Sequence, residues 1–465
     1  MPEFPAAGHA QERPVPAAPI PPPAQLPFFR YTRALRRDAL ASLHEEVYHR
    51  WVVEIRHWRM HTFIVNDPAG IKHVLVDNAD NYVKGGIEPH IRRTGQGTSF
   101  AESNPEEWQQ RRRSMQSSLD FRTVLEKSTL ITDFALAVVQ RWKSLPTGSI
   151  IDVPSEMAAL TGAIAGRILF SADSDEFNGI LARLFGRYQG ETNLALLDFA
   201  PLADLPWRYI KRRTRPRTLQ DLNDCIDRVI TRRLSGGTST GDDFLGRLLS
   251  VRDPKTGAGL SANEVHGQIL TVLGSGHDTT SLALMWTWYL LALHPQVESK
   301  LHAELDDVLA GRTASFDDIA RLPYTRMVIE ESLRLYPPFH TLAWRGALND
   351  DEIRGVRIPR GSTVSIVPWV LHRHAKLWED RERFDPERFS PERSRERSRY
   401  AYLPFGVGPR VCVAASFAMS ELSLIIATLA QHYRLRLAPG HMVEPQGLVL
   451  LRMRDGMKAA LERRD

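Results

Sequence analysis

The sequence is poor in cysteine: Cys225 and Cys412 are the only two among its 465 residues. Two cysteines so far apart cannot form the disulfide framework of a small secreted protein, and their scarcity is typical of a reducing compartment. The chain also begins without the charged and then apolar stretch that marks a signal peptide. We therefore predict a cytoplasmic protein.

Long hydrophobic runs are missing as well. The most apolar stretch, "LALMWTWYLLAL" at 282–293, is too short to cross a bilayer and continues a helical pattern, so we expect no transmembrane anchor. Residues 30–465 contain no internal repeat and no clear linker, although the length of the chain would allow two or three domains. We predict one large domain over 28–465, preceded by a flexible arm rich in proline and alanine at 1–27.

Acidic residues are slightly outnumbered by basic ones, which gives a formal net charge of +5. A basic balance is one sign of nucleic-acid binding. Here the arginines alternate with acids, as in "PERSRERSRY", and no nucleic-acid motif accompanies them, so we predict no nucleic-acid partner. Two interpretations of the surplus stay open: a docking face for an acidic protein, and a plain solvated surface.

The hydrophobic pattern predicts a mainly helical protein with small sheets, an α+β fold. Alternation around residues 51–66 predicts a strand pair, helical periods dominate from about 105 to 335, and short strands return at 352–367. Near the C-terminus, Asp455-Gly456 separates two apolar runs and is a signal for a hairpin turn.

A single long helix is predicted from about 262 to 294. Ser261 and Glu264 form a capping-box pattern at its start, and His294-Pro295 marks its end. At 1.5 Å per residue, such a helix would be about 50 Å long, enough to cross the whole domain.

The middle of this helix gathers poor helix formers, namely Gly274, Gly276, Asp278, Thr279 and Thr280. One interpretation is close packing of another helix at the glycines. The other is a local opening of the helix that presents a carboxylate and a hydroxyl to a buried site. We read His277 beside them as a packed or solvent-facing residue and not as a metal ligand.

Cys412 lies in the loop "YLPFGVGPRVCVAASFAMSEL", whereas Cys225 has the surroundings of an inert core residue. Gly406 and Gly408 allow a tight turn with the backbone close to a planar group, and Arg410 precedes the cysteine by two positions. A helical pattern follows, whose first free amides favour a thiolate. This combination suits an electropositive centre that carries anionic groups, such as haem iron with its propionates.

The segment Phe405, Gly408, Arg410, Cys412 resembles the haem-binding loop of the cytochrome P450 family, F-x-x-G-x-R-x-C. Ala414 stands where the family commonly has glycine. "SGHDTT", which begins at Ser275, resembles the family's oxygen-activation motif, except that its first position is usually alanine or glycine.

Further segments match the family in order and spacing. "EESLRLYPP" carries the E-x-x-R pair Glu331 and Arg334, and "FDPERF" supplies Arg388 as its third partner. "EWQQRRR" provides Trp108 and Arg112 in the pattern W-x-x-x-R. Each segment alone also has an ordinary interpretation, such as a helix-surface ion pair, a core tryptophan or a solvated arginine.

The resemblance implies a cytochrome P450 fold, with the long helix over haem b and with 28–465 as the catalytic domain. It implies that Cys412 is the iron ligand and that Glu331, Arg334 and Arg388 form a structural network. The implied haem-binding residues are Trp108, Arg112, Arg345, Phe405, Gly408, Arg410, Cys412 and Ala414.

The activity that the resemblance implies is insertion of one oxygen atom of O2 into a lipophilic small molecule. Asp278 and Thr279 would deliver protons. Candidate walls of the substrate pocket are the loop before Trp108, the stretch 193–207, Ser275, Phe339, Leu342 and Val449. Fatty acids, terpenoids, steroids and aromatic compounds all stay open as substrates. A haem-binding sensor without turnover is the competing class.

No flavin or iron–sulfur pattern follows the haem-binding loop. We therefore expect electrons to come from NAD(P)H through a separate ferredoxin or flavodoxin and its reductase. Arg111, Arg113 and their neighbours would frame the docking face, and we expect a monomer.

Overall fold

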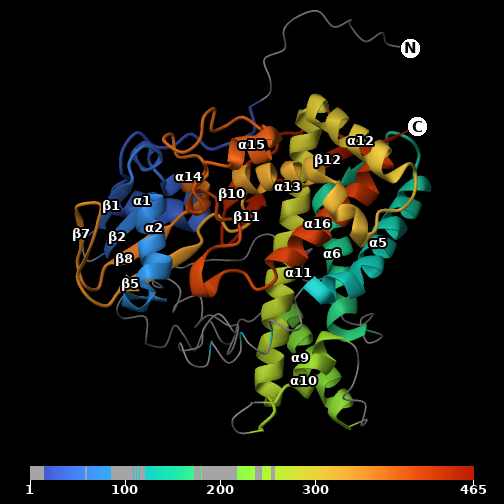
Figure 1. Ribbon diagram of the computed structural model, residues 1–465, viewed down its shortest axis with the longest axis horizontal. Helices are drawn as coiled ribbons and strands as arrows, with labels where there is room; N and C mark the ends of the chain where they lie inside the picture. The colour runs from blue at the N-terminus through green and yellow to red at the C-terminus, as the bar shows by residue number, and fades with distance from the viewer. Residues whose placement is uncertain are drawn as a thin grey trace, which may run out of the picture.

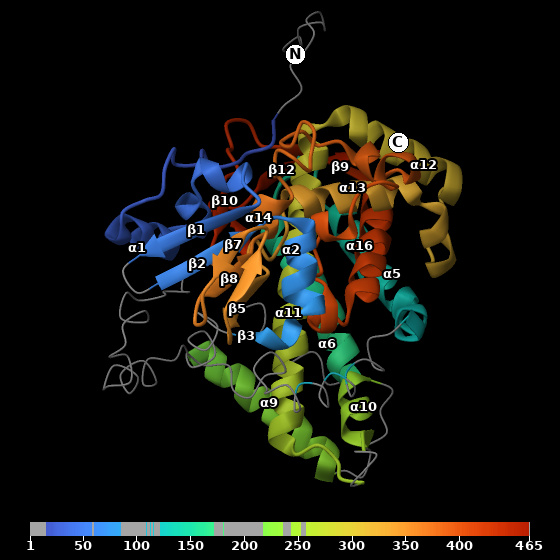
Figure 2. The ribbon, with the colours of Figure 1, turned by 60° about the vertical axis from the view of Figure 1, so that its left-hand side comes forward.

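The computed structural model describes residues 15–57, 60–84, 108, 112, 115, 121–171, 180, 217–235, 243–252 and 257–464. Helix α11 (Ala262–Leu293) runs the full height of the molecule, with the larger sheet on one side and helices α5, α6 and α16 on the other (Figure 1). Its 32 residues correspond to about 48 Å. Figure 2 shows the same division from a second direction.

The other α-helices are α1 (Phe28–Arg37), α2 (Pro68–Lys72), α5 (Phe121–Lys143), α6 (Val153–Phe170), α9 (Arg217–Ser235), α10 (Phe244–Ser250), α12 (Pro295–Leu309), α13 (Pro323–Leu335), α14 (Pro368–Leu371), α15 (Pro391–Ser394) and α16 (Ala415–Ala430). Short helical turns are η1 (Ala39–Ser42), η2 (Glu45–Tyr48), η3 (His73–Asp77), η4 (Ala79–Asn81), η7 (Phe316–Arg321), η8 (Pro386–Phe389), η9 (Arg399–Ala401) and η10 (Gly408–Arg410). In the described part of the chain, no helix is both long and apolar enough to span a membrane.

The largest sheet has the strand order β1-β2-β8-β5-β3, in which only the β2–β8 pairing is parallel. Its strands are β1 (Val52–His57), β2 (Met60–Val65), β3 (Tyr82–Lys84), β5 (Ala343–Ala347) and β8 (Thr363–Ile366). Three smaller sheets contain β4 (Ile150–Asp152) with β12 (Lys458–Arg463) and β9 (Tyr433–Leu437), β6 (Asp351–Ile353) with β7 (Val356–Ile358), and β10 (Pro445–Gly447) with β11 (Leu451–Met453).

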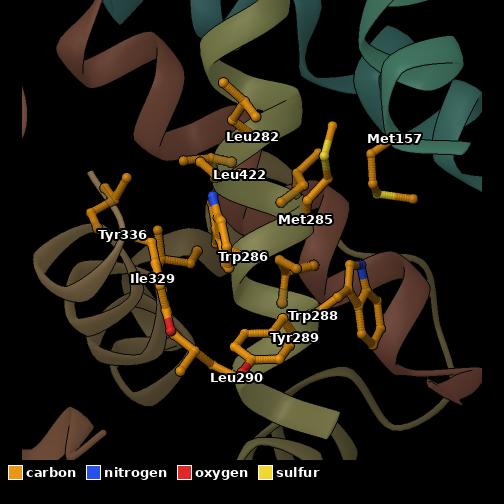
Figure 3. Close-up of a cluster of buried hydrophobic side chains, with 14 of the residues drawn as sticks. Met157, Leu282, Met285, Trp286, Trp288, Tyr289, Leu290, Ile329, Tyr336 and Leu422 are labelled. Carbon is orange, nitrogen blue, oxygen red and sulfur yellow. The ribbon is translucent and has the colours of Figure 1, made fainter. Parts of the chain in front are cut away.

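The core gathers around the second half of α11, where nearly every side chain is buried. Trp286 stacks on Tyr336, which follows α13, with ring centroids 4.0 Å apart, and Tyr289 meets both rings edge-on (Figure 3). Aromatic pairs of this kind add about 0.5–1.5 kcal/mol to the burial of their area. The C-terminal half of α11 is therefore anchored in the core and fixes the position of the rest of the helix.

The predicted long helix and strands are confirmed. Ser261 accepts from the Glu264 amide and the Glu264 carboxylate accepts from the Ser261 amide, so the capping box is complete. The strand pair at 51–66 is the β1–β2 hairpin, and the short strands at 352–367 are β6, β7 and β8.

The predicted C-terminal hairpin is wrong in its pairing. Gly456 turns with a φ of +71°, as the Asp-Gly signal indicates. However, β11 before the turn pairs with β10, whereas β12 after it pairs with β4 and β9. The turn therefore carries the chain from one small sheet to another.

Both interpretations of the middle of the helix need correction. α11 is helical without a break from Ala262 to Leu293, so no opening of the helix occurs. Among the described residues, close packing at the glycines is also absent, because a Cβ placed on Gly274 or Gly276 would meet none of their atoms within 4 Å. What this stretch offers is an exposed side of an intact helix.

Residues 15–27, the described part of the predicted arm, lie against the domain. Ala17 donates its amide to the Tyr289 hydroxyl at 3.3 Å, and its carbonyl accepts from the Tyr336 hydroxyl at 2.7 Å. Further along, the Pro22 carbonyl accepts from the Glu45 amide. The boundary of the domain near residue 28 stays a prediction.

Candidate haem site

The loop that carries Cys412 contains two glycines in a left-handed conformation, and one of them, Gly408, packs directly against the turn η3. Gly406 and Gly408 have φ values of +75° and +78°, a region that side chains other than glycine rarely adopt. A Cβ on Gly408 would lie 2.1 Å from the Leu75 carbonyl oxygen. The Cys412 amide donates to the Phe405 carbonyl at 2.9 Å, which closes the loop and fixes the cysteine at its rim.

Cys412 is exposed, whereas Cys225 is buried as predicted. Protein atoms around the loop nevertheless reduce the hydration of the Cys412 sulfur, and this raises the pKa of its thiol above the usual value. The Ala414 amide, which donates to the sulfur, and the Arg112 guanidinium both lower that pKa but do not outweigh burial. The amide at the helix terminus therefore stabilises the thiolate form of Cys412, but not enough to offset burial. A bound cation would have to supply the remaining stabilisation of the thiolate.

Two arginines and a tryptophan lie beside this loop. The side chain of Trp108 is buried, with the Arg410 guanidinium 4.6 Å and the Arg112 guanidinium 5.5 Å from the centre of its ring system. Arg112 also donates to the Val411 carbonyl at 2.7 Å, directly before Cys412. Burial lowers the pKa of Arg112, and the neighbouring Cys412 opposes that shift. The structure thus brings these four sequence-predicted residues together.

Arg345 lies on β5, whose preceding residue Leu342 contacts the same loop: a Cβ on Gly406 would be 3.3 Å from the Leu342 side chain. One Arg345 nitrogen donates to the Trp344 carbonyl at 3.3 Å. Phe405 and Ala414 are partly buried and pack against the main core. Ala414 also precedes the first turn of α16, so a methyl group at this position is accommodated.

In the middle of α11, the exposed residues are Gly274, Ser275 and Gly276. The Ser275 hydroxyl donates to the Thr271 carbonyl at 2.6 Å, and the Thr279 hydroxyl donates to the Ser275 carbonyl. These bonds turn both hydroxyl protons back toward carbonyls of the preceding helical turn, so both hydroxyls are compatible with a continuous helix. Val413 and Ala414 pack on the same apolar cluster as Leu273 and so link the cysteine loop to this part of α11.

Two ionised or ionisable residues next to this stretch escaped the sequence analysis. The Arg452 guanidinium lies 2.7 Å from the Asp278 carboxylate, and Glu421 on α16 accepts a bond of 3.4 Å from the Thr280 hydroxyl. Burial raises the pKa of Glu421 to about 8. A lone acid in the apolar run "SFAMSELSLIIATLA" was a visible signal for Glu421, whereas nothing local marked Arg452.

His277 is buried, with its Nδ1 atom 2.9 Å from the Thr161 hydroxyl of α6. It is therefore a packed residue, as predicted. In the described part of the chain, no three His, Cys, Asp or Glu residues are grouped as a metal site.

The described pocket candidates lie on three segments: Phe339 and Leu342 on one, Val449 on a second, and Ser275 on α11. Phe339 and Val449 are 40% and 41% exposed, and Leu342 is half-buried. His340 connects the first segment with the second, because its Nε2 atom lies 2.7 Å from the Leu448 carbonyl oxygen. The loop before Trp108, the stretch 193–207, and Arg111 and Arg113 lie outside the described residues.

Glu331 and Arg334 form a fully buried bidentate ion pair on α13, with N–O distances of 2.6 and 2.8 Å and 0% exposure of both side chains. The Arg388 Nε atom lies 3.4 Å from the same carboxylate. Arg334 further donates to the carbonyls of residues 372, 381 and 383, so the network ties α13 to the segment that leads to the cysteine loop.

These residues fit a haem. The group needs one sulfur ligand and cations for its two propionates. Cys412 is an exposed cysteine, Arg112 and Arg410 supply cations, and the glycine at 408 lets the loop backbone approach the Leu75 carbonyl, where an added Cβ would lie 2.1 Å from the oxygen.

Comparisons with known proteins agree with this geometry. The family model described as cytochrome P450 matches residues 19–454. A cyclooctat-9-en-7-ol 5-monooxygenase of Streptomyces melanosporofaciens is 34% identical over 421 residues, covering 90% of this chain and 90% of that protein. A pentalenene oxygenase of Streptomyces avermitilis is 30% identical over 92% of this chain and 93% of its own.

A solved structure shows the same fold. The crystal structure of the cytochrome P450DA heme domain superposes with a TM-score of 0.80 and 25% identity, covering 96% of this chain and 98% of that one. The predicted α+β architecture with a long helix across the molecule is therefore confirmed. The chain belongs to the cytochrome P450 family of monooxygenases.

Proposed function

We propose that this monooxygenase hydroxylates a cyclic terpenoid, in the reaction RH + O2 + 2 e⁻ + 2 H⁺ → ROH + H2O. The observation that carries the haem chemistry is the accessible Cys412 sulfur on a loop flanked by Arg112, Arg410 and Trp108. The terpenoid class is supported by the relatives with 34% and 30% identity, whose names specify a cyclooctatenol and pentalenene.

In this proposal Cys412 ligates the iron of haem b, and Arg112, Arg345 and Arg410 pair with the propionates beside Trp108. The bound haem supplies the activation of O2 that the side chains cannot perform. Phe405, Gly408 and Ala414 shape the backbone on the cysteine side. Because burial raises the pKa of the free Cys412 thiol, binding of the metal would release its proton.

The proton path runs through Asp278 and Thr279 on the exposed side of α11. The Asp278 side chain is 15% exposed, so in this proposal it connects Thr279 with the solvent. The Thr279 hydroxyl hydrogen points to the Ser275 carbonyl, which leaves the oxygen of Thr279 able to accept a hydrogen bond from the haem side.

An apolar substrate suits the described pocket residues. Phe339, Leu342 and Val449 offer apolar surface, and the Ser275 hydroxyl is already engaged by Thr271. A rigid cyclic hydrocarbon skeleton is held by such walls chiefly through burial of its surface. Fatty acids, steroids and aromatic compounds are the alternatives that the experiment compares.

For electron supply, we propose NAD(P)H as the source and a separate ferredoxin or flavodoxin with its reductase as the carrier. We also propose a cytoplasmic monomer. Glu331, Arg334 and Arg388 have a structural role, because the ion pair is fully buried and away from solvent.

The first experiment is the absorption spectrum of the purified protein, reduced and exposed to carbon monoxide. A strongly red-shifted Soret band is expected from thiolate ligation. The same preparation is then titrated with cyclic terpenes, fatty acids, steroids and aromatic compounds, and a substrate-induced spectral shift is expected for the terpenes. A histidine-type spectrum would overturn the ligand, and tight binding of fatty acids alone would overturn the substrate class. Normal spectra without O2 consumption would favour a sensor.

A further inference from the structure

The Asp278 carboxylate is bound by a second side chain, the guanidinium of Arg452. The Nη2 atom of Arg452 lies 2.7 Å from the Asp278 Oδ2 atom, and the two side chains are 18% and 15% exposed. Such a partly buried, charge-assisted contact is stronger and better oriented than an exposed surface pair. The two residues are 174 positions apart in the sequence.

The strand that carries Arg452 is fixed from both sides. The Trp286 indole of α11 donates to the Leu451 carbonyl at 3.2 Å, and the Leu451 amide donates to the Pro338 carbonyl at 2.8 Å. Across the small sheet, Arg452 is paired with Gln446 of β10. Figure 1 shows β11 directly beside α11. The guanidinium is therefore aimed at the helix by backbone that cannot easily move.

Other charged groups near this pair point elsewhere. His277 is turned to Thr161 of α6, and both Asp278 and Arg452 contribute to its electrostatic surroundings. Glu421 approaches Thr280 on another side of α11. Within the described residues, Arg452 is thus the cation that forms a salt bridge with Asp278.

We propose that Arg452 is a positioning residue for proton delivery: it keeps the Asp278 carboxylate in one orientation beside Thr279. This inference rests on the proposed function, in which Asp278 moves protons. Without the guanidinium, the carboxylate would rotate about its side-chain bonds and spend much of its time away from the productive geometry.

Two candidate pocket residues lie next to the backbone that fixes this strand. Val449 lies two residues before Leu451, and Phe339 directly follows Pro338, which accepts the Leu451 amide. A substrate that contacts these pocket walls therefore contacts the segments that place Arg452. In this proposal, the fit of the substrate is linked to the orientation of the proton donor.

The test compares Arg452→Met with Arg454→Met in the haem-loaded protein, supplied with an artificial ferredoxin and reductase pair. Arg454 is a matched control because it follows on the same segment, is half exposed, and pairs with Glu444 and Asp38 instead. For Arg452→Met, we expect the yield of product per NAD(P)H to fall at least fivefold, with hydrogen peroxide accounting for the lost electrons. The Arg454→Met variant should keep its yield.

Arg452→Lys keeps the charge and should recover part of the yield, whereas haem content and the substrate dissociation constant should stay within twofold in all variants. A yield in Arg452→Met equal to that of the control, or higher than that of the unmodified protein, would overturn the proposal. A protein that shows no product with any substrate would instead count against the proposed function.

Urea unfolding provides a readout that needs no turnover. Asp278→Asn and Arg452→Met should each lower the unfolding midpoint, and the double variant should unfold at about the same urea concentration as either single variant, because the two changes remove one contact. Additive shifts would show that the two side chains do not act together, and would overturn the pairing on which the inference depends.

Discussion

At the scale of single residues, burial decides the chemistry of Glu421. Its carboxyl group lies in the apolar face of α16 and receives one bond, from the Thr280 hydroxyl. Burial raises its pKa to about 8 and outweighs the lowering effect of that bond. Glu421 is therefore protonated at neutral pH. Its hydrogen-bond partner, Thr280, directly follows Asp278 and Thr279 in the sequence.

This raised pKa predicts the pH dependence of stability. In the unfolded chain the Glu421 carboxyl loses its proton near the ordinary value of 4.5, whereas in the folded protein it keeps the proton until about 8. As the pH rises between these values, proton release favours the unfolded state, and the stability contributed at low pH is lost at about 1.4 kcal/mol per pH unit.

The Glu421→Gln variant should remove this slope, because glutamine keeps the shape and the hydrogen bond but cannot ionise. The measurement is the free energy of unfolding from urea titrations at pH 5.5, 6.5 and 7.5. The variant should gain stability relative to the unmodified protein as the pH increases. If the two curves run parallel, Glu421 is ionised in the folded protein and the assignment is wrong.

The residues that could be predicted from the sequence are those whose partners are local or whose spacing is diagnostic. Cys412, Arg410 and Gly408 lie within five positions of one another, so one segment identifies the loop. The Arg452–Asp278 contact joins residues 174 positions apart, and no local pattern distinguishes Arg452 from other arginines. Long-range contacts of this kind depend on the fold and become visible only in the structure.

At the scale of elements, the same distinction explains which parts of the fold were predicted. α11 is set by its own capping box and by apolar periodicity, both written into one stretch of chain. The turn at Gly456 is equally local and occurs where expected. The partners of β11 and β12 are not local, because each strand pairs with a segment outside the turn, and this is where the predicted hairpin fails.

The packing of η10 against η3 is the element contact that positions the cysteine loop. Gly408 opens η10, and its φ of +78° together with the 2.1 Å approach to the Leu75 carbonyl leaves no space for a side chain. A non-glycine residue in this conformation costs about 1–3 kcal/mol, and a backbone clash adds to that cost.

Gly408→Ala should therefore lower both the stability and the haem content of the purified protein. Gly148→Ala is the matched control, since Gly148 has a φ of +79° but an added Cβ would have no atom of the described residues within 4 Å. Thermal unfolding and the ratio of Soret to protein absorbance measure the two effects. Equal losses in both variants would mean that backbone strain alone matters and that the contact with η3 does not hold the loop.

At the scale of the whole molecule, one buried ion pair ties α13 to the segment that precedes the cysteine loop. Arg334 contacts Glu331 on its own helix and the carbonyls of residues 372, 381 and 383, which belong to the segment between β8 and η8. Removing one partner of a fully buried pair typically costs about 3–5 kcal/mol, and here Arg388 would remain beside the Glu331 carboxylate at 3.4 Å.

Arg334→Met should accordingly destabilise the protein by about 3–5 kcal/mol, with loss of haem following from loss of the loop. Arg326→Met on the same helix is the control, because the Arg326–Glu330 contact of 3.1 Å has an arginine that is 65% exposed and should contribute about 0–1 kcal/mol. Adding Glu331→Gln to Arg334→Met removes the other half of the same pair, so the two losses of stability should not add. Urea unfolding of the four proteins, with the Soret band as a second probe, distinguishes the cases. If Arg334→Met unfolds at the same urea concentration as Arg326→Met, the buried pair does not hold the molecule together, and the fit of the loop must depend on packing alone.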